Sequence, residues 1–140
     1  MEYKAFGKTY VVRIDRGEEI LSQVKQVCEA EKITLGKISG LGAVNKAVVG
    51  LFETATQEYR STVMTGDFEI TSLTGNITTM EGEVYLHVHA NLAGADNSTF
   101  GGHLNEAVVS ATCELILQAF EGQVNRAFDE TIGLNLLDFS

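Results

Sequence analysis

The sequence contains no cluster of basic residues, and it has neither proline nor tryptophan. Ten lysines and arginines are scattered among 19 acidic residues, which gives a formal net charge of −9 and an isoelectric point near 4.7. Proteins hold the phosphate backbone of duplex DNA mainly through lysine and arginine, so this balance argues against non-specific DNA binding. A local basic patch created by folding or by association of copies remains open.

Cysteine is also scarce, and neither Cys28 nor Cys113 belongs to a Cys-x-x-Cys pair. A cysteine zinc site and a thioredoxin-type motif are therefore not expected. Both cysteines lie among apolar residues and are predicted to be buried free thiols. No apolar run approaches the roughly 20 residues that a membrane span needs, and the first residues do not resemble a signal peptide. These features predict a soluble protein of the reducing cytoplasm.

The length and periodicity of the chain indicate its fold class. A chain of 140 residues, 44% of them hydrophobic, predicts a single domain over residues 1–140. Apolar residues at helical spacing predict one main helix over residues 18–32. β-branched runs and period-two alternation predict strands at residues 9–14, in three short runs within 33–52, and at 58–63, 68–73, 76–79, 84–92, 107–119 and 131–137.

Turn residues 65–67 are expected to separate two of these strands. A helix is the competing interpretation of residues 105–120, although unbroken alternation there favours a strand. The resulting prediction is an α+β fold, with a mainly antiparallel sheet of about seven or eight strands and one main helix.

All three histidines fall within seventeen residues, at positions 87, 89 and 103. On a strand, His87 and His89 point to the same face, about 6.5–7 Å apart along the chain, so their imidazoles can converge on one ion. Gly101 and Gly102 allow the backbone to pass close to that point before His103. Three neutral imidazoles with an open fourth position are the ligand set of catalytic zinc sites. Zinc is the first choice, although nickel, copper and iron also suit imidazole, and ordinary polar-face histidines remain the alternative.

Three further polar residues are candidates for a fourth ligand or for support of the histidines: Asp96, Asn91 and Glu83. Acidic residues in loops are more often simply solvated. The sequence has no Ser-His-Asp order, no nucleophile elbow and no glycine-rich phosphate loop. No general base is apparent, so no reaction is assigned and the question of catalysis stays open.

Two other acidic residues have structural interpretations. Glu114 falls on the polar face of its predicted strand, where exposure is a better interpretation than catalysis. Glu69 lies between apolar residues, and it is either exposed or a buried ion-pair partner of Arg13 or Arg126.

Five segments resemble one known family, the plant and prokaryote conserved (PPC) domain, which accompanies AT-hooks in plant nuclear proteins. The matching segments are Arg13-Ile14-x-x-Gly17-Glu18, Ile38-Ser39-Gly40-Leu41-Gly42-Ala43, Gly66-Asp67-Phe68-Glu69-Ile70, Leu86-His87-Val88-His89 and Gly101-Gly102-His103-Leu104. The resemblance implies an α+β domain that forms a homotrimer, with metal bound at His87, His89 and His103. It also brings a DNA-binding description, which rests on analogy with the plant proteins.

Two departures from the family argue against DNA binding and against plant-style partner recruitment. The nearest string to an Arg-Gly-Arg-Pro hook is the acidic Arg16-Gly17-Glu18-Glu19, and the plant interaction motif has arginine at Asp67 and leucine at Thr71. The first hypothesis is therefore a cytoplasmic trimer that binds a divalent metal, with a small-molecule or anionic ligand at the open position. A DNA-associated multimeric regulator and a purely structural oligomerisation module are the alternatives.

Overall fold

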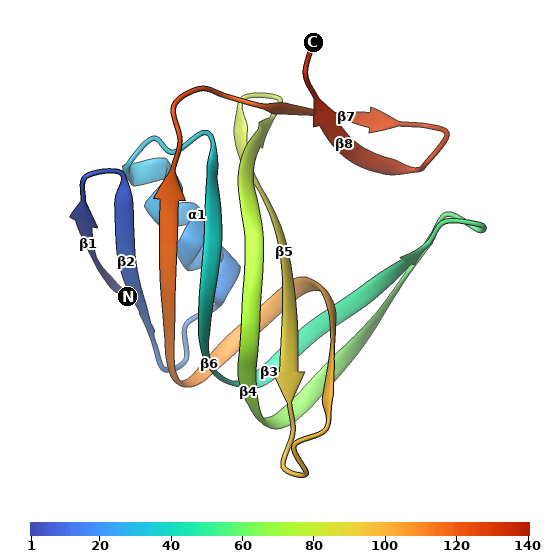
Figure 1. The fold of residues 1–140 in the computed structure, drawn as a ribbon. Helices are drawn as coiled ribbons and strands as arrows, with labels where there is room; N and C mark the ends of the chain where they lie inside the picture. The colour runs from blue at the N-terminus through green and yellow to red at the C-terminus, as the bar shows by residue number, and fades with distance from the viewer.

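The computed structural model describes all residues from 1 to 140. It contains eight strands in one sheet and one helix (Figure 1). The elements are β1 (Glu2–Phe6), β2 (Thr9–Asp15), α1 (Ile20–Ala30), β3 (Gly36–Glu53), β4 (Glu58–Met80), β5 (Glu83–Ala93), β6 (Thr99–Ala119), β7 (Asn125–Asp129) and β8 (Leu134–Asp138). The predicted α+β class, the strand number and the single main helix are confirmed. The helix is not long and apolar enough to cross a membrane.

The sheet runs in the order β1-β2-β6-β3-β4-β7-β8, and β5 pairs with both β4 and β6. All strand pairs are antiparallel except the single contact between β4 and β7. Because β6 pairs with β5 near its start and with β3 along the rest of its length, strands β3, β4, β5 and β6 close on one another. This closure brings the second half of β5 beside the start of β6.

The helix α1 packs its apolar face against the sheet, as its periodicity predicts. Its buried residues are Ile20, Val24, Val27 and Cys28, and they join a core of 24 buried hydrophobic residues. The carboxylate of Glu19 accepts hydrogen bonds from the backbone N–H groups of Leu21 and Ser22, which fixes the start of the helix two residues later than predicted. Cys28 and Cys113 are both buried and unpaired.

Strands β3 and β4 are longer than the sequence predicted. The prediction of a turn at residues 65–67 is wrong. That segment lies inside β4, where the pairing with β3 shifts register opposite Val44 and Lys46. Gly66 has a φ of +130°, which an L side chain rarely adopts, so a bulge replaces the turn. Glycine in β3 likewise permits close approach rather than ending the strand, since a Cβ at Gly40 would lie 2.4 Å from the carbonyl oxygen of Glu114.

Strands β1 and β7 were not predicted from the sequence. Strand β1 is exposed along its whole length, so it carries no alternation between buried and exposed positions. The strand character of residues 105–120 is confirmed, because β6 continues to Ala119. The predicted final strand is shorter than expected and pairs with β7 to form a hairpin.

Two extensions project from the sheet on the same side (Figure 1). One is the far end of the β3–β4 hairpin, which we call the arm (residues 46–65), and the other is the β7–β8 hairpin. The amide of Gln57 at the tip of the arm donates hydrogen bonds to the carbonyl oxygens of Glu130 and Thr131 in the β7–β8 turn, at 3.3 and 2.8 Å. The two extensions therefore meet at their tips and enclose the space between them.

Candidate metal centre

His87 and His89 lie on one face of β5, as the period-two pattern predicts. The two Nε2 atoms are 3.2 Å apart, and the ring centroids are 5.0 Å apart. A tetrahedral zinc ion with bonds of about 2.05 Å holds two of its nitrogen ligands roughly 3.3 Å apart. This pair of nitrogens therefore already has the separation that a shared ion requires.

His103 joins them from β6, at the point where that strand passes from β5 to β3. It is in register with His89 on one side and with Gly50 of β3 on the other. Its ring centroid lies 5.2 Å from that of His87 and 5.6 Å from that of His89. The closure of the four strands thus places the third histidine beside the other two.

The glycines before His103 act within the strand rather than at a bend. A Cβ on Gly101 would lie 2.2 Å from the carbonyl oxygen of Ala90, and a Cβ on Gly102 would lie 2.5 Å from that of Gly50. Real side chains do not tolerate such distances from backbone atoms. The two glycines therefore let β6 approach β5 and β3 closely enough to bring His103 into the cluster.

The three histidines form a compact donor set. One ligand nitrogen from each lies within 4.8 Å of the others, and small rotations of the rings bring such atoms to bonding distance of one ion. Burial, followed by the charges of His103, Arg126 and His89, lowers the pKa of His87 to about 4. Burial and the charge of His89 also lower the pKa of His103. Both groups are neutral at pH 7 and offer lone pairs, as imidazole ligands must.

The donor set lies in a cleft of about 820 Å³ between the arm and the β7–β8 hairpin. Tyr59 of the arm packs edge-on against His103, with ring centroids 5.9 Å apart, and its hydroxyl donates to the side-chain oxygen of Asn105. The remaining lining is polar near the histidines and apolar along β8. The lining residues are Gly50, Leu51, Phe52, Tyr59, Asn76, Tyr85, His87, His89, Gly102, His103, Arg126, Leu134, Asn135, Leu136 and Leu137, and none of them is acidic.

Arg126 on β7 is the one lysine or arginine that lines this cleft, and it is only 9% exposed. Its guanidinium donates at 2.9 Å to the hydroxyl of Thr78, to the side-chain oxygen of Asn76 and to the carbonyl oxygen of Asn135. It also lies over the ring of Tyr85, 4.8 Å from the centroid. Burial lowers the pKa of Arg126, and the chain places no carboxylate beside the guanidinium to offset this effect.

Sequence reasoning missed Arg126 and Tyr59 as cleft residues. It considered Arg126 only as a partner of Glu69. That ion pair is wrong, and the alternative, an exposed Glu69, is confirmed. A buried arginine between exposed neighbours on a short strand leaves no periodic signal. Only the pairing of β7 with β4 places it beside the histidines.

The other sequence candidates lie outside the histidine cluster. Asp96 is exposed in the β5–β6 turn and accepts hydrogen bonds from Ser98, which lower its pKa. The amide of Asn91 donates to Thr71. Glu83 is exposed at the start of β5. The structure therefore brings together the three predicted histidines without these supporting groups.

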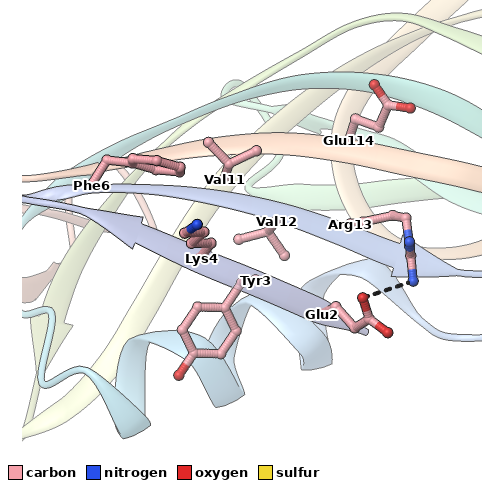
Figure 2. Close-up of a pocket in the computed structure, with 8 residues that line it drawn as sticks. All are labelled: Glu2, Tyr3, Lys4, Phe6, Val11, Val12, Arg13 and Glu114. Carbon is pink, nitrogen blue, oxygen red and sulfur yellow. Dashed lines mark ion pairs between the residues drawn. The ribbon is translucent and has the colours of Figure 1, made fainter.

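A second pocket of about 440 Å³ lies on the outer face of β1 and β2 (Figure 2). Figure 2 shows Glu2 of β1 joined to Arg13 of β2, 3.2 Å apart, with Glu114 on the neighbouring strand β6. Arg13 also pairs with Asp15 at 2.8 Å. Glu114 is exposed, as predicted. The charges of this pocket are thus already balanced within the chain.

The protein is an α+β domain in which strands β3, β4, β5 and β6 close on one another. Three histidines lie together where β5 and β6 meet. The sequence matches the Plants and Prokaryotes Conserved domain over residues 1–121, and the chain belongs to that family. The matched segment ends before Arg126 and the β7–β8 hairpin. No curated protein gives a significant match.

Three solved structures are similar to this chain over nearly its whole length. A candidate DNA-binding protein from Bacteroides thetaiotaomicron is 32% identical, with a TM-score of 0.96 and coverage of 99% of this chain and 96% of the other. A metal-containing protein from Archaeoglobus fulgidus is 34% identical, with a TM-score of 0.88 and coverage of 97% and 96%. A plant- and prokaryote-conserved protein from Pyrococcus horikoshii is 30% identical, with a TM-score of 0.87 and coverage of 98% and 94%.

Proposed function

We propose that this protein binds one divalent metal ion per chain through His87, His89 and His103, with zinc as the first choice. The convergence of three imidazole nitrogens within 4.8 Å carries the proposal. The similar protein from Archaeoglobus fulgidus, described as metal-containing, supports it. Three protein ligands leave a coordination position open, and the cleft gives a small molecule access to it.

A metal ion held by the three histidines would supply Lewis-acid chemistry to a molecule bound beside it. The chain's own residues supply the surroundings. Tyr59 fixes the ring of His103 from one side, and Asn76 lies in register with His87 on the neighbouring strand. No carboxylate lines the cleft to act as a general base, so we assign no reaction.

The test is native mass spectrometry with elemental analysis, on protein purified without a nickel column. The wild-type protein is expected to carry one metal ion per chain, and the double variant His87→Ala, His89→Ala none. Asp96→Asn is the matched control, because it removes an exposed acidic group near the same hairpin and should leave the metal in place. Wild-type protein that takes up no zinc, nickel, copper or iron would defeat the proposal.

We further propose, from the family resemblance, that the protein is a cytoplasmic homotrimer. Large apolar side chains are exposed on the arm and on the β7–β8 hairpin, among them Leu51 at 71%, Val63 at 63% and Phe128 at 60%. Exposed apolar patches mark contacts between subunits, so the arm and the hairpin are the surfaces that we expect to meet in the trimer. Two buried, unpaired cysteines suit a reducing compartment. The same mass spectra report subunit number, and a monomer would contradict the trimer without affecting the metal proposal.

A DNA-associated regulator is the alternative, supported by the description of the similar Bacteroides thetaiotaomicron protein. The net charge of −9 opposes it. Fluorescence anisotropy with labelled duplex DNA decides between the two. We expect no retention at physiological salt, and submicromolar affinity with a steep salt dependence would favour the regulator instead.

A further inference from the structure

The guanidinium of Arg126 has no anionic partner within the chain. Its three hydrogen bonds all go to neutral oxygen atoms, on Thr78, Asn76 and Asn135. A guanidinium carries five N–H donors, so one N–H on each terminal nitrogen remains unused by these contacts. Burying a cation without a counter-ion is costly, and a bound anion would offset that cost.

Arg126 is also close to the histidines. Its NH2 atom lies 2.9 Å from the side-chain oxygen of Asn76, and Asn76 is in direct register with His87. Side chains in direct register on antiparallel strands have Cβ atoms about 4.5–5.5 Å apart. Arg126 and His87 line the same cleft, so a molecule of a few carbon atoms can contact both side chains at once.

The cleft is cationic although the protein is strongly acidic. Its lining contains one arginine, no lysine and no acidic residue, against a net charge of −9 for the whole chain. The side chains from β8 that line it are mainly leucines, namely Leu134, Leu136 and Leu137. A single positive charge beside apolar side chains complements a monoanion with a hydrocarbon body.

We propose that this cleft binds a small organic carboxylate, whose two oxygens pair with Arg126 and whose apolar body lies against the leucines of β8. Paired N–H donors of arginine match the two oxygens of a carboxylate. A phosphate carries up to two charges and has no apolar part, so it fits this lining less well. The proposal deepens the proposed function and rests on it in one respect, because it takes the histidine site of the same cleft as the neighbour of the bound carboxylate.

The test is an NMR titration of zinc-loaded, isotope-labelled protein with butyrate, its neutral analogue butyramide and inorganic phosphate. Butyrate is expected to shift leucine methyl signals of β8 and to bind more tightly than either of the others. Arg126→Gln should weaken butyrate binding at least about tenfold, the loss typical of a charge-assisted hydrogen-bonded pair. Arg13→Gln is the matched control, because Arg13 lies in the outer pocket and should leave the affinity unchanged.

A second variant keeps the proposal testable if Arg126→Gln does not fold. Asn76→Asp places a carboxylate 2.9 Å from the same guanidinium and supplies the missing anion from within the chain. It should weaken butyrate binding to a similar extent while Arg126 stays in place. Unchanged butyrate affinity in a folded Arg126→Gln protein, or in Asn76→Asp, would overturn the proposal, and so would equal binding of butyramide or tighter binding of phosphate.

Failure of this inference and failure of the proposed function give different results. Zinc content is measured on the same samples, and the titration is repeated on metal-free protein. If the protein retains zinc but its butyrate binding does not depend on Arg126, only the carboxylate proposal is overturned. If the protein takes up no zinc but binds butyrate in a way that depends on Arg126, the metal proposal is overturned and the carboxylate proposal is supported.

Discussion

The outer face of β1 and β2 and the cleft beneath the β7–β8 hairpin each present an arginine, in opposite circumstances. Arg13 is 52% exposed and pairs with Glu2 and Asp15. Arg126 is 9% exposed and contacts only neutral oxygens and the ring of Tyr85. On the outer face the chain supplies both signs of charge, and water screens them. In the cleft the chain supplies only the positive charge of Arg126. That charge is largely shielded from water, so it interacts strongly with any charged group beside it.

This contrast separates a structural pair of charges from a binding group. Exposed ion pairs contribute little to stability, whereas a buried charge without a partner is costly to the folded protein. The two regions also differ in their histidines, since all three lie together in the cleft and none lies on the outer face. Four measurements test how far the two regions differ.

The largest effect is expected on metal affinity. His103→Ala removes one of three ligand nitrogens and should weaken zinc binding at least about a hundredfold, since even loss of a group that only supports a ligand costs 10–100-fold. Competition with a chromophoric chelator measures this change. Glu114→Gln, in the outer pocket, is the control that should keep wild-type affinity. Equal weakening by both substitutions would erase the distinction between the regions.

The second effect concerns stability. Arg126→Ala removes three hydrogen bonds and leaves one buried and two partly buried oxygens without these donors, so the free energy of unfolding should fall by about 2 kcal/mol. Urea denaturation followed by circular dichroism measures it. Arg126→Lys should recover only part of the loss, because an ammonium cannot reproduce the guanidinium's fork of donors. Full recovery in Arg126→Lys would show that charge alone, without geometry, stabilises the hairpin.

The third effect is a pH dependence of the metal-free protein. The pKa of His87 is about 4 in the folded state against an ordinary value of 6.5, so the unfolded chain binds a proton first as the pH falls. The contribution of this histidine to stability is therefore full above pH 6.5 and is lost progressively down to pH 4. The loss should be about 1.5 kcal/mol after allowance for the partial exposure of the ring.

Urea midpoints at several pH values, compared with those of His87→Gln, isolate this contribution from that of the carboxylates. The variant should lose less stability than the wild type between pH 6.5 and 4. The same pH dependence in both proteins would show that His87 is as solvated as a side chain on the outer face.

The smallest effect is expected on the outer face itself. Arg13→Ala and Glu2→Ala disrupt an exposed pair and should leave both the urea midpoint and the zinc content unchanged within error. A clear loss of stability in either variant would mean that this exposed ion pair contributes to stability as strongly as a buried charge does.

The histidine cluster could be predicted because it depends on local geometry. His87 and His89 share a face of any strand, and Gly101 and Gly102 indicated a close approach before His103. The structure shows that this approach happens inside β6, where the strand is in contact with both β5 and β3. The helix α1 was predictable for the same reason, since its apolar period is contained within eleven residues.

The features that escaped prediction depend on pairings between distant segments. Strand β1 has no alternation, and the long strands β3 and β4 are interrupted by bulges that a sequence pattern reads as turns. Arg126 is separated from His87 by 39 positions, and only the contact of β7 with β4 and the bond to Asn76 bring it near. A single sequence carries no signal for such long-range contacts.

The placement of Arg126 has a consequence for how selectivity can diverge among related proteins. The strands that carry the histidines lie within the part of the chain that matches the family, whereas the cleft's one cation and three of its leucines belong to the hairpin that follows. If the two proposals hold, substitutions in that hairpin alone would alter which anions the cleft accepts and would leave the three histidines in place.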